Sequence, residues 1–188
     1  ALSDCLDCAA GKYSVINGSS SDATCLDCPP GEYLETSGND ALSDCIQCDA
    51  GKYSGINGSS SNKTCLNCPP GTYLATIGND ALSDCIACAA GKYSVINGSS
   101  SGTTCTNCPA GKYIQTGSSD ALSDCLDCAA GKYSVEYGSS SDATCIDCAA
   151  GKYSVINGSS SNATCTNCPP GTYLESPSND ALSDCLDC

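Results

Sequence analysis

Two cysteines separated by two residues recur every twenty residues along the whole chain. The second cysteine of each pair is residue 8, 28, 48, 68, 88, 108, 128, 148, 168 or 188. In all but the last pair, a glycine follows three residues later and a tyrosine five residues later, as in Cys25-Leu-Asp-Cys-Pro-Pro-Gly-Glu-Tyr33. A fixed period of this kind predicts a repeat protein whose modules each contact only their neighbours.

Two module types share this frame. Type A begins Cys8-Ala-Ala-Gly-Lys-Tyr13, and type B begins Cys28-Pro-Pro-Gly-Glu-Tyr33. After the end of a truncated module at 1–8, type A is predicted at 8–28, 48–68, 88–108, 128–148 and 148–168, and type B at 28–48, 68–88, 108–128 and 168–188. Since the chain starts and stops in the same phase of the repeat, we expect it to be a window of a longer array.

Local patterns predict short strands and turns. Residues 11–16 are typical of a strand, and Asn17-Gly18 predicts a type I′ turn that returns the chain toward Thr24-Cys25 as a loose hairpin. In type B, residues 39–44 predict a single capped helical turn. The predicted fold class is small, disulfide-rich and all-β with irregular loops, arranged as a linear solenoid or rod of modules.

Composition indicates that cross-links replace a conventional core. Leu, Ile and Val together number 26 of 188 residues and the net charge is −14, a combination typical of disorder. The 20 cysteines, however, are a density that marks a disulfide scaffold. Disulfides order chains that have little core and persist in oxidising compartments. The chain is therefore predicted to be extracellular, either secreted or at a cell surface.

Translational symmetry favours one simple disulfide pattern, because nearly identical modules should pair alike. The second cysteine of one pair would join the first cysteine of the next and close one ring per module. The predicted bonds are Cys8–Cys25, Cys28–Cys45, Cys48–Cys65, Cys68–Cys85, Cys88–Cys105, Cys108–Cys125, Cys128–Cys145, Cys148–Cys165 and Cys168–Cys185. Cys5 and Cys188 would pair outside the window.

Other uses of these residues stay open. A bond inside each C-x-x-C closes a tiny, strained loop that suits redox proteins better than scaffolds. The spacing also lies in the zinc-ribbon range, but a chain with no histidine is a poor match for a metal array. Carboxylates beside the type B joints, such as Asp40 and Asp44, could hold Ca²⁺, although they form no recognised calcium loop. We expect no metal and no cofactor.

The Cys-Pro-Pro-Gly-Thr-Tyr sequences at Cys68–Tyr73 and Cys168–Tyr173 resemble the ephrin-receptor-like cysteine-rich repeat. They are also similar to the small first module of tumour-necrosis-factor-receptor cysteine-rich domains. The resemblance implies that the tyrosine ring packs on the disulfide and against the neighbouring module, as a miniature core. That role would fall on Tyr13, Tyr33, Tyr53, Tyr73, Tyr93, Tyr113, Tyr133, Tyr153 and Tyr173.

The chain also departs from the family pattern. Type A modules have Ala-Ala or Asp-Ala where the family usually has proline. Tumour-necrosis-factor receptors alternate the small module with a second, interlocked module, and the chain has none. The ligand-binding surfaces of those receptors therefore do not carry over.

Sequons predict N-linked glycans on the modules. The acceptor residues are Asn17, Asn57, Asn62, Asn97, Asn157 and Asn162. Catalysis is not expected, because the chain lacks histidine and arginine and its cysteines suit a structural role. A net charge of −14 disfavours nucleic acid, and the window contains no apolar run long enough for a membrane span.

Near identity of the modules favours a structural function, because a ligand site usually requires one module to differ from the rest. We expect a structural subunit of a glycosylated extracellular fibre, stalk or cell-surface appendage. Its expected partners are neighbouring copies of itself or other extracellular matrix or surface glycoproteins. The alternative is the spacer region of a cell-surface receptor or adhesin ectodomain.

Overall fold

The computed structural model describes residues 6–188 and consists of tandem two-stranded hairpins, one in each module. The first strands of the hairpins are β1 (Lys12–Tyr13), β3 (Glu32–Tyr33), β5 (Lys52–Tyr53), β7 (Thr72–Tyr73), β9 (Lys92–Tyr93), β11 (Lys112–Tyr113), β13 (Lys132–Tyr133), β15 (Lys152–Tyr153) and β17 (Thr172–Tyr173). Their antiparallel partners are β2 (Leu26–Asp27), β4 (Ile46–Gln47), β6 (Leu66–Asn67), β8 (Ile86–Ala87), β10 (Thr106–Asn107), β12 (Leu126–Asp127), β14 (Ile146–Asp147), β16 (Thr166–Asn167) and β18 (Leu186–Asp187).

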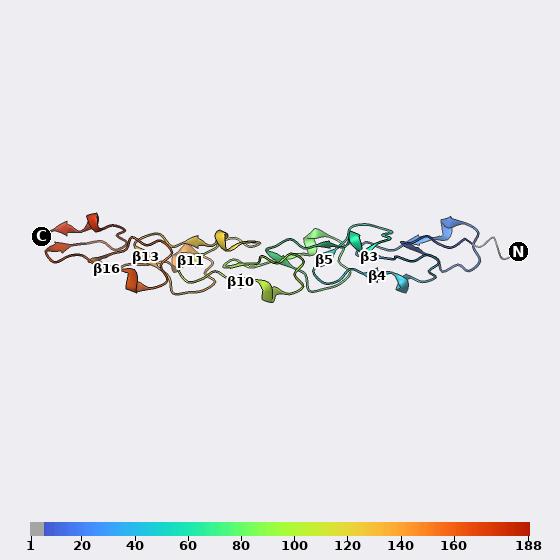
Figure 1. The fold of residues 1–188 in the computed structure, drawn as a ribbon, viewed down its shortest axis with the longest axis horizontal. Coiled ribbons are helices and arrows are strands. Elements are labelled where there is room, and N and C mark those ends of the chain that lie inside the picture. Colours follow the sequence, from blue (N-terminus) through green and yellow to red (C-terminus); the bar gives the residue numbers. More distant parts are fainter. Residues whose placement is uncertain (1–5) are drawn as a thin grey trace. The chain divides into compact units, whose positions relative to one another are not determined.

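A single turn of 3₁₀ helix precedes the second strand of each hairpin (Figure 1). These turns are η1 (Asp22–Thr24), η2 (Leu42–Asp44), η3 (Asn62–Thr64), η4 (Leu82–Asp84), η5 (Gly102–Thr104), η6 (Leu122–Asp124), η7 (Asp142–Thr144), η8 (Asn162–Thr164) and η9 (Leu182–Asp184). Residues 6–188 contain no α-helix and no closed barrel. The predicted small, disulfide-rich, all-β fold with irregular loops and tandem modules is confirmed.

The chain divides into two compact units. One is the described part of Ala1–Ile86 together with Ile96–Thr104, and the other is Ala87–Val95 together with Cys105–Cys188. Within each unit, the same contacts recur from one module to the next.

The hairpin is shorter than the strand predicted over residues 11–16. Only Lys12 and Tyr13 pair, with Asp27 and Leu26 respectively, so the returning strand lies after Cys25 rather than at Thr24-Cys25. The N–H of Ser14 instead donates to the carbonyl oxygen of Asn39 in the next module, 3.1 Å away. The first strand of the hairpin therefore ends after two residues, and the backbone of Ser14 bonds the next module instead.

The Asn-Gly turn is not of the predicted type. A type I′ turn needs positive φ at both central residues, whereas Gly18 has φ 71° and Asn17 is not among the described residues with positive φ. Positive φ at the glycine alone is the pattern of a type II turn. In the later type A modules this geometry turns the glycine N–H away from its own hairpin, and Gly58 donates to the Cys28 carbonyl at 2.8 Å.

The single helical turn predicted in type B is present, and its cap comes from inside the turn. In η2 the Asp44 carboxylate accepts hydrogen bonds from the N–H groups of Ala41, at 3.0 Å, and Asp40, at 3.2 Å. The type A turn was not predicted. In η1 the hydroxyl of Ser21 accepts from the Ala23 N–H at 3.2 Å, which is an ordinary N-cap.

Adjacent modules are joined by main-chain hydrogen bonds. The N–H of Gly11 donates to the Leu34 carbonyl at 2.8 Å, and Gly38 donates back to the Cys8 carbonyl at 2.9 Å. Tyr13 and Asn39 form an isolated parallel bridge, and equivalent bridges recur along both units. Since these bonds use only the backbone, modules of either type can follow one another.

The expectation that each module contacts only its neighbours is wrong. Gly11 lies against the backbone of Gly58, which belongs to the second module ahead. A Cβ atom on Gly11 would lie 2.2 Å from the Gly58 carbonyl oxygen, and its φ of +87° also favours glycine. The recurring glycine is therefore required by a close approach between modules that are not adjacent in sequence.

Candidate functional site

The joint between successive modules is the site that the chain repeats, and nine disulfides define it. Each bond joins the second cysteine of one C-x-x-C pair to the first cysteine of the next. The bonds within residues 6–188 are Cys8–Cys25, Cys28–Cys45, Cys48–Cys65, Cys68–Cys85, Cys88–Cys105, Cys108–Cys125, Cys128–Cys145, Cys148–Cys165 and Cys168–Cys185. Cys188 is an exposed free thiol, and Cys5 lies outside the described residues.

Two residues separate one covalent ring from the next. Cys25 closes the ring that begins at Cys8, with Cα atoms 5.6 Å apart, and Cys28 opens the ring that ends at Cys45, with Cα atoms 5.8 Å apart. The intervening Leu26 and Asp27 form strand β2, which pairs with β1. The link between the rings is therefore held in a hairpin rather than left as a free hinge.

The peptide groups of the buried cysteine are fully bonded. Cys28 has no exposed surface. Its N–H donates to the Gly11 carbonyl at 2.9 Å, and its carbonyl accepts from the Gly58 N–H at 2.8 Å. Because an unpaired buried peptide group is costly, these two bonds stabilise the joint. They also bring three successive modules together at one residue.

The tyrosines predicted as module core are half-buried, except for Tyr173, which is 41% exposed. Tyr13 packs against Cys28, Leu34 and Cys45, which form the buried cluster of the next module. Tyr93 packs in the same way against Cys108, Ile114 and Cys125. In these two modules the ring therefore covers the next module's disulfide and serves the contact between modules.

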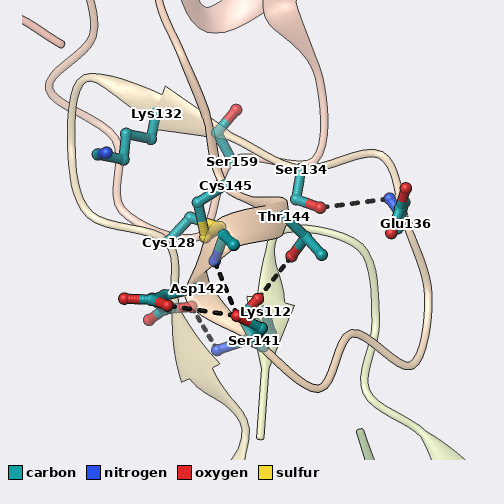
Figure 2. The surroundings of a disulfide bond; sticks show 12 residues. Lys112, Cys128, Lys132, Ser134, Glu136, Ser141, Asp142, Thr144, Cys145 and Ser159 are labelled. Atoms are coloured by element: carbon teal, nitrogen blue, oxygen red, sulfur yellow. Dashed lines mark hydrogen bonds and ion pairs between the residues drawn. A yellow bond between two sulfur atoms is a disulfide. The ribbon is translucent and has the colours of Figure 1, made fainter. Parts of the chain in front are cut away.

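The residue that follows each tyrosine was missed as a core position. It is Leu or Ile in type B, with Leu34 3% exposed, and Ser in type A, with Ser54 1% exposed. Figure 2 shows the type A version in the surroundings of the Cys128–Cys145 disulfide, where the Ser134 hydroxyl accepts a hydrogen bond from the Glu136 N–H at 3.4 Å. A polar residue that alternates with Leu gave no apolar signal in the sequence.

The six sequon asparagines all lie on the surface. The Asn57 side-chain amide donates to the Asp27 carboxylate at 3.3 Å, and the Asn157 side-chain oxygen accepts from the Ala130 N–H at 2.8 Å. The Asn157 contact reaches back to the preceding module, and the Asn57 contact reaches back two modules. The exposed position of the asparagines is compatible with an attached sugar.

Cross-strand ion pairs flank the joints in some modules. Lys12 pairs with Asp27 and Lys112 with Asp127, each at 2.5 Å, while Lys132 pairs with Asp147 at 2.8 Å. The hydrogen bonds of Asp147 with Lys132 and Ser178 hold the pKa of this carboxyl below its ordinary value of 3.8. These side chains are partly exposed, so each pair contributes little to stability.

Residues 6–188 contain no group of three or more His, Cys, Asp or Glu side chains placed to hold a metal ion. The Asp44 carboxylate, one of the candidate calcium ligands, caps its own helical turn. No helix in this part of the chain has the length and apolar character needed to cross a membrane.

Comparison with known proteins gives the family. The family described as tyrosine-protein kinase ephrin type A/B receptor-like matches residues 35–85 and 136–185, which together make up more than half of the chain. Each matched segment contains one complete type A ring followed by one complete type B ring. No curated protein matches the chain. With its disulfide rings, C-x-x-C joints and packed tyrosines, the chain belongs to the ephrin type A/B receptor-like family of cysteine-rich repeats.

Proposed function

We propose that the chain is the structural repeat region of a glycosylated extracellular fibre, stalk or cell-surface appendage. The observation that carries this proposal is the repetition of the same joint. Each covalent ring is followed by a two-residue link, and the Cys28 carbonyl bond to the Gly58 N–H has counterparts at Cys8, Cys48, Cys68, Cys88, Cys108, Cys128 and Cys148. Such a site provides mechanical continuity and resistance to unfolding.

The bonding pattern suits tension along the chain. Pulling on one module is opposed by the disulfide of that ring and by backbone hydrogen bonds to the next module. A ring of this length is stabilised by about 3 kcal/mol on chain-entropy grounds. The joint therefore combines a covalent link with a hydrogen-bonded contact, which is what a spacer or fibre subunit needs.

The family and the disulfides indicate an extracellular or cell-surface, non-catalytic module. Exposed sequon asparagines and a net charge of −14 support a hydrated, sugar-coated surface. Neighbouring copies of the chain or other matrix and surface glycoproteins are the proposed partners. No metal or cofactor is part of the proposal.

The family match favours a second candidate, the spacer region of a cell-surface receptor or adhesin ectodomain. In that case the repeat would hold a binding domain away from the membrane. The same joint geometry serves both functions, so the two differ in what the full-length protein carries and how it assembles.

Immunogold electron microscopy on the native source, with antibodies raised against the repeats, separates the two candidates. A structural subunit should be labelled along fibres or appendages that persist after detergent extraction. Label confined to the plasma membrane and released by detergent as single particles would contradict the fibre and favour the receptor spacer. Preimmune serum provides the control for non-specific label.

A further inference from the structure

We propose that Tyr137 is a site of tyrosine O-sulfation, selected by its exposure and by the acidic residue that precedes it. The inference goes beyond the proposed function, because it holds equally for a fibre subunit and for a receptor spacer. It requires only the extracellular or cell-surface location that the family and the disulfides indicate.

Tyr137 lies outside the recurring motif. The chain has 10 tyrosines, and each of the others follows a C-x-x-C pair by five residues. Motif tyrosines serve packing, as Tyr93 does when it covers the cluster of Cys108, Ile114 and Cys125. Tyr137 is 71% exposed instead. A large aromatic side chain that stays in water contributes little to stability, so its phenol is available for another use.

The turn that carries Tyr137 is held on both sides by hydrogen bonds. The Glu136 N–H donates to the Ser134 hydroxyl at 3.4 Å (Figure 2). The Gly138 N–H donates to the Cys108 carbonyl of the preceding module at 2.8 Å. The phenol is therefore presented at the tip of an anchored turn, where an enzyme reaches it without unfolding the module.

The charge around Tyr137 is negative. Glu136 is exposed and takes part in none of the ion pairs found in residues 6–188, and Asp142 is exposed as well. Lys132, the nearest lysine in sequence, pairs with Asp147 at 2.8 Å. An enzyme that binds a polyanionic sulfuryl donor needs a basic site, and an acidic segment is attracted to such a site.

A nearly identical turn elsewhere in the chain isolates the two residues on which the proposal depends. Residues 94–99 read Ser-Val-Ile-Asn-Gly-Ser, and residues 134–139 read Ser-Val-Glu-Tyr-Gly-Ser. The glycine φ angles are 70° at Gly98 and 71° at Gly138. The Gly98 N–H also donates to the Cys68 carbonyl at 2.8 Å, as the Gly138 N–H does to Cys108. The second turn therefore differs in having a carboxylate and a phenol in place of Ile and the sequon asparagine.

The transfer is written for phosphoadenylyl sulfate, a mixed anhydride of phosphoric and sulfuric acid. The Tyr137 Oη atom forms a bond to the sulfur of the sulfuryl group, and the bond from that sulfur to the bridging oxygen breaks. The adenylyl phosphate leaves with the electron pair, and the phenol proton goes to a base of the enzyme. Because Tyr137 is exposed, the charged sulfate ester stays in water and the fold accommodates it.

The test incubates the folded, oxidised chain with purified tyrosylprotein sulfotransferase and radiolabelled phosphoadenylyl sulfate, and peptide mass spectrometry locates the label. We expect sulfate on Tyr137 and no label on the motif tyrosines. Tyr137→Phe, a conservative change at an exposed position, should abolish labelling of the chain. Glu136→Ile should lower the rate of labelling at least about tenfold, because the attraction to the basic enzyme site is lost.

Variants of the sister turn separate exposure from acidity. Asn97→Tyr places a tyrosine on the same type of turn directly after Ile96, and should be labelled as slowly as Tyr137 in the Glu136→Ile chain. Adding Ile96→Glu to Asn97→Tyr rebuilds the Glu-Tyr-Gly sequence, and should raise labelling of residue 97 to a rate comparable with that of Tyr137.

Three results would overturn the proposal. The first is an unlabelled Tyr137 under conditions in which the enzyme sulfates an acidic tyrosine peptide. The second is labelling of the Asn97→Tyr chain at residue 97 as fast as at Tyr137, which would remove Glu136 from the selection. The third is an unmodified Tyr137 in protein isolated from the native source. None of these results bears on whether the repeats form a fibre or a spacer.

Discussion

The main-chain carbonyl of Cys28 accepts a hydrogen bond from the N–H of Gly58, 2.8 Å away, although thirty residues separate them in sequence. The Cys28 N–H donates in turn to the Gly11 carbonyl, and Gly11 packs against the Gly58 backbone. Three modules thus meet at one buried cysteine. Order in this chain comes from such joints, because each module has almost no apolar core.

The close approach between modules predicts that substituting alanine for two equivalent glycines, Gly51 and Gly151, lowers the stability of the fold by different amounts. A Cβ atom on Gly51 would lie 2.2 Å from the Gly98 carbonyl oxygen, whereas one on Gly151 would have no neighbour within 4 Å, and both residues have positive φ, +85° and +81°. Gly151→Ala should cost about 1–2 kcal/mol for the left-handed backbone alone. Gly51→Ala should cost about 1–3 kcal/mol more, because of the overlap.

Native-state hydrogen exchange measures this difference. The Cys68 amide donates to the Gly51 carbonyl and the Cys168 amide donates to the Gly151 carbonyl, so each amide reports on its own hairpin. The Cys68 amide of Gly51→Ala should lose much more protection than the Cys168 amide of Gly151→Ala. Equal losses of protection would mean that the contact of Gly51 with Gly98, two modules ahead, contributes nothing to stability.

Tyrosine packing predicts a different contrast between Tyr93 and Tyr137. Tyr93 covers Cys108, Ile114 and Cys125 of the next module, while Tyr137 is 71% exposed. Tyr93→Ala should destabilise the following module by about 2–4 kcal/mol, through lost packing. Tyr137→Ala should change the stability of the module that contains Tyr137 by less than about 0.5 kcal/mol.

Exchange of the Cys125 amide, which follows η6 and donates to the Leu122 carbonyl, provides the readout for Tyr93→Ala. The Cys145 amide, which donates to Asp142, provides the matching readout for Tyr137→Ala. Unchanged protection of the Cys125 amide in Tyr93→Ala would mean that Tyr93 does not stabilise the contact between modules.

The environment of Asp147 predicts a pH dependence. Its hydrogen bond with Lys132, and then that with Ser178, lower the pKa of the folded carboxyl below 3.8. A carboxyl with a depressed folded pKa stabilises the fold above its unfolded pKa, and this contribution is lost as pH falls through the folded pKa. The pair should therefore add its small stabilisation above about pH 4 and lose it in more acidic solution.

Carbon-13 NMR titration of the Asp147 carboxyl checks this directly. Lys132→Met should raise its pKa toward 3.8, and Ser178→Ala should raise it by a smaller amount. A pKa that is unchanged in both variants would show that neither partner stabilises the charged form.

The fold class, the twenty-residue module and the helical turn of type B could be predicted from sequence, because period, cysteine spacing and capping residues are local signals. The return of the hairpin at Leu26–Asp27 could not. Its position is decided by Ser14, whose N–H bonds Asn39 in the next module instead of extending the strand. No local pattern encodes a partner twenty-five residues away.

The core was predicted only in part for a similar reason. The tyrosines stand out in the sequence as the recurrent large side chains, yet Ser54 and its equivalents are more deeply buried. Ser54 can be recognised as a core residue only when the neighbouring module is in place. The Ser54 carbonyl accepts a hydrogen bond from the Gly31 N–H of that module at 2.7 Å. The contact of Gly11 with Gly58 likewise depends on stacking across two modules.

Each C-x-x-C joins two rings and does not itself form a ring, and disulfide mapping tests this arrangement most directly. Protease Asp-N cleaves before Asp22, Asp27 and Asp40, and therefore separates Cys25 from Cys28 in an unreduced digest. We expect peptide 22–26 to be linked to peptide 7–21, which carries Cys8. A peptide 22–26 linked to 27–39, through a bond between Cys25 and Cys28, would contradict the account.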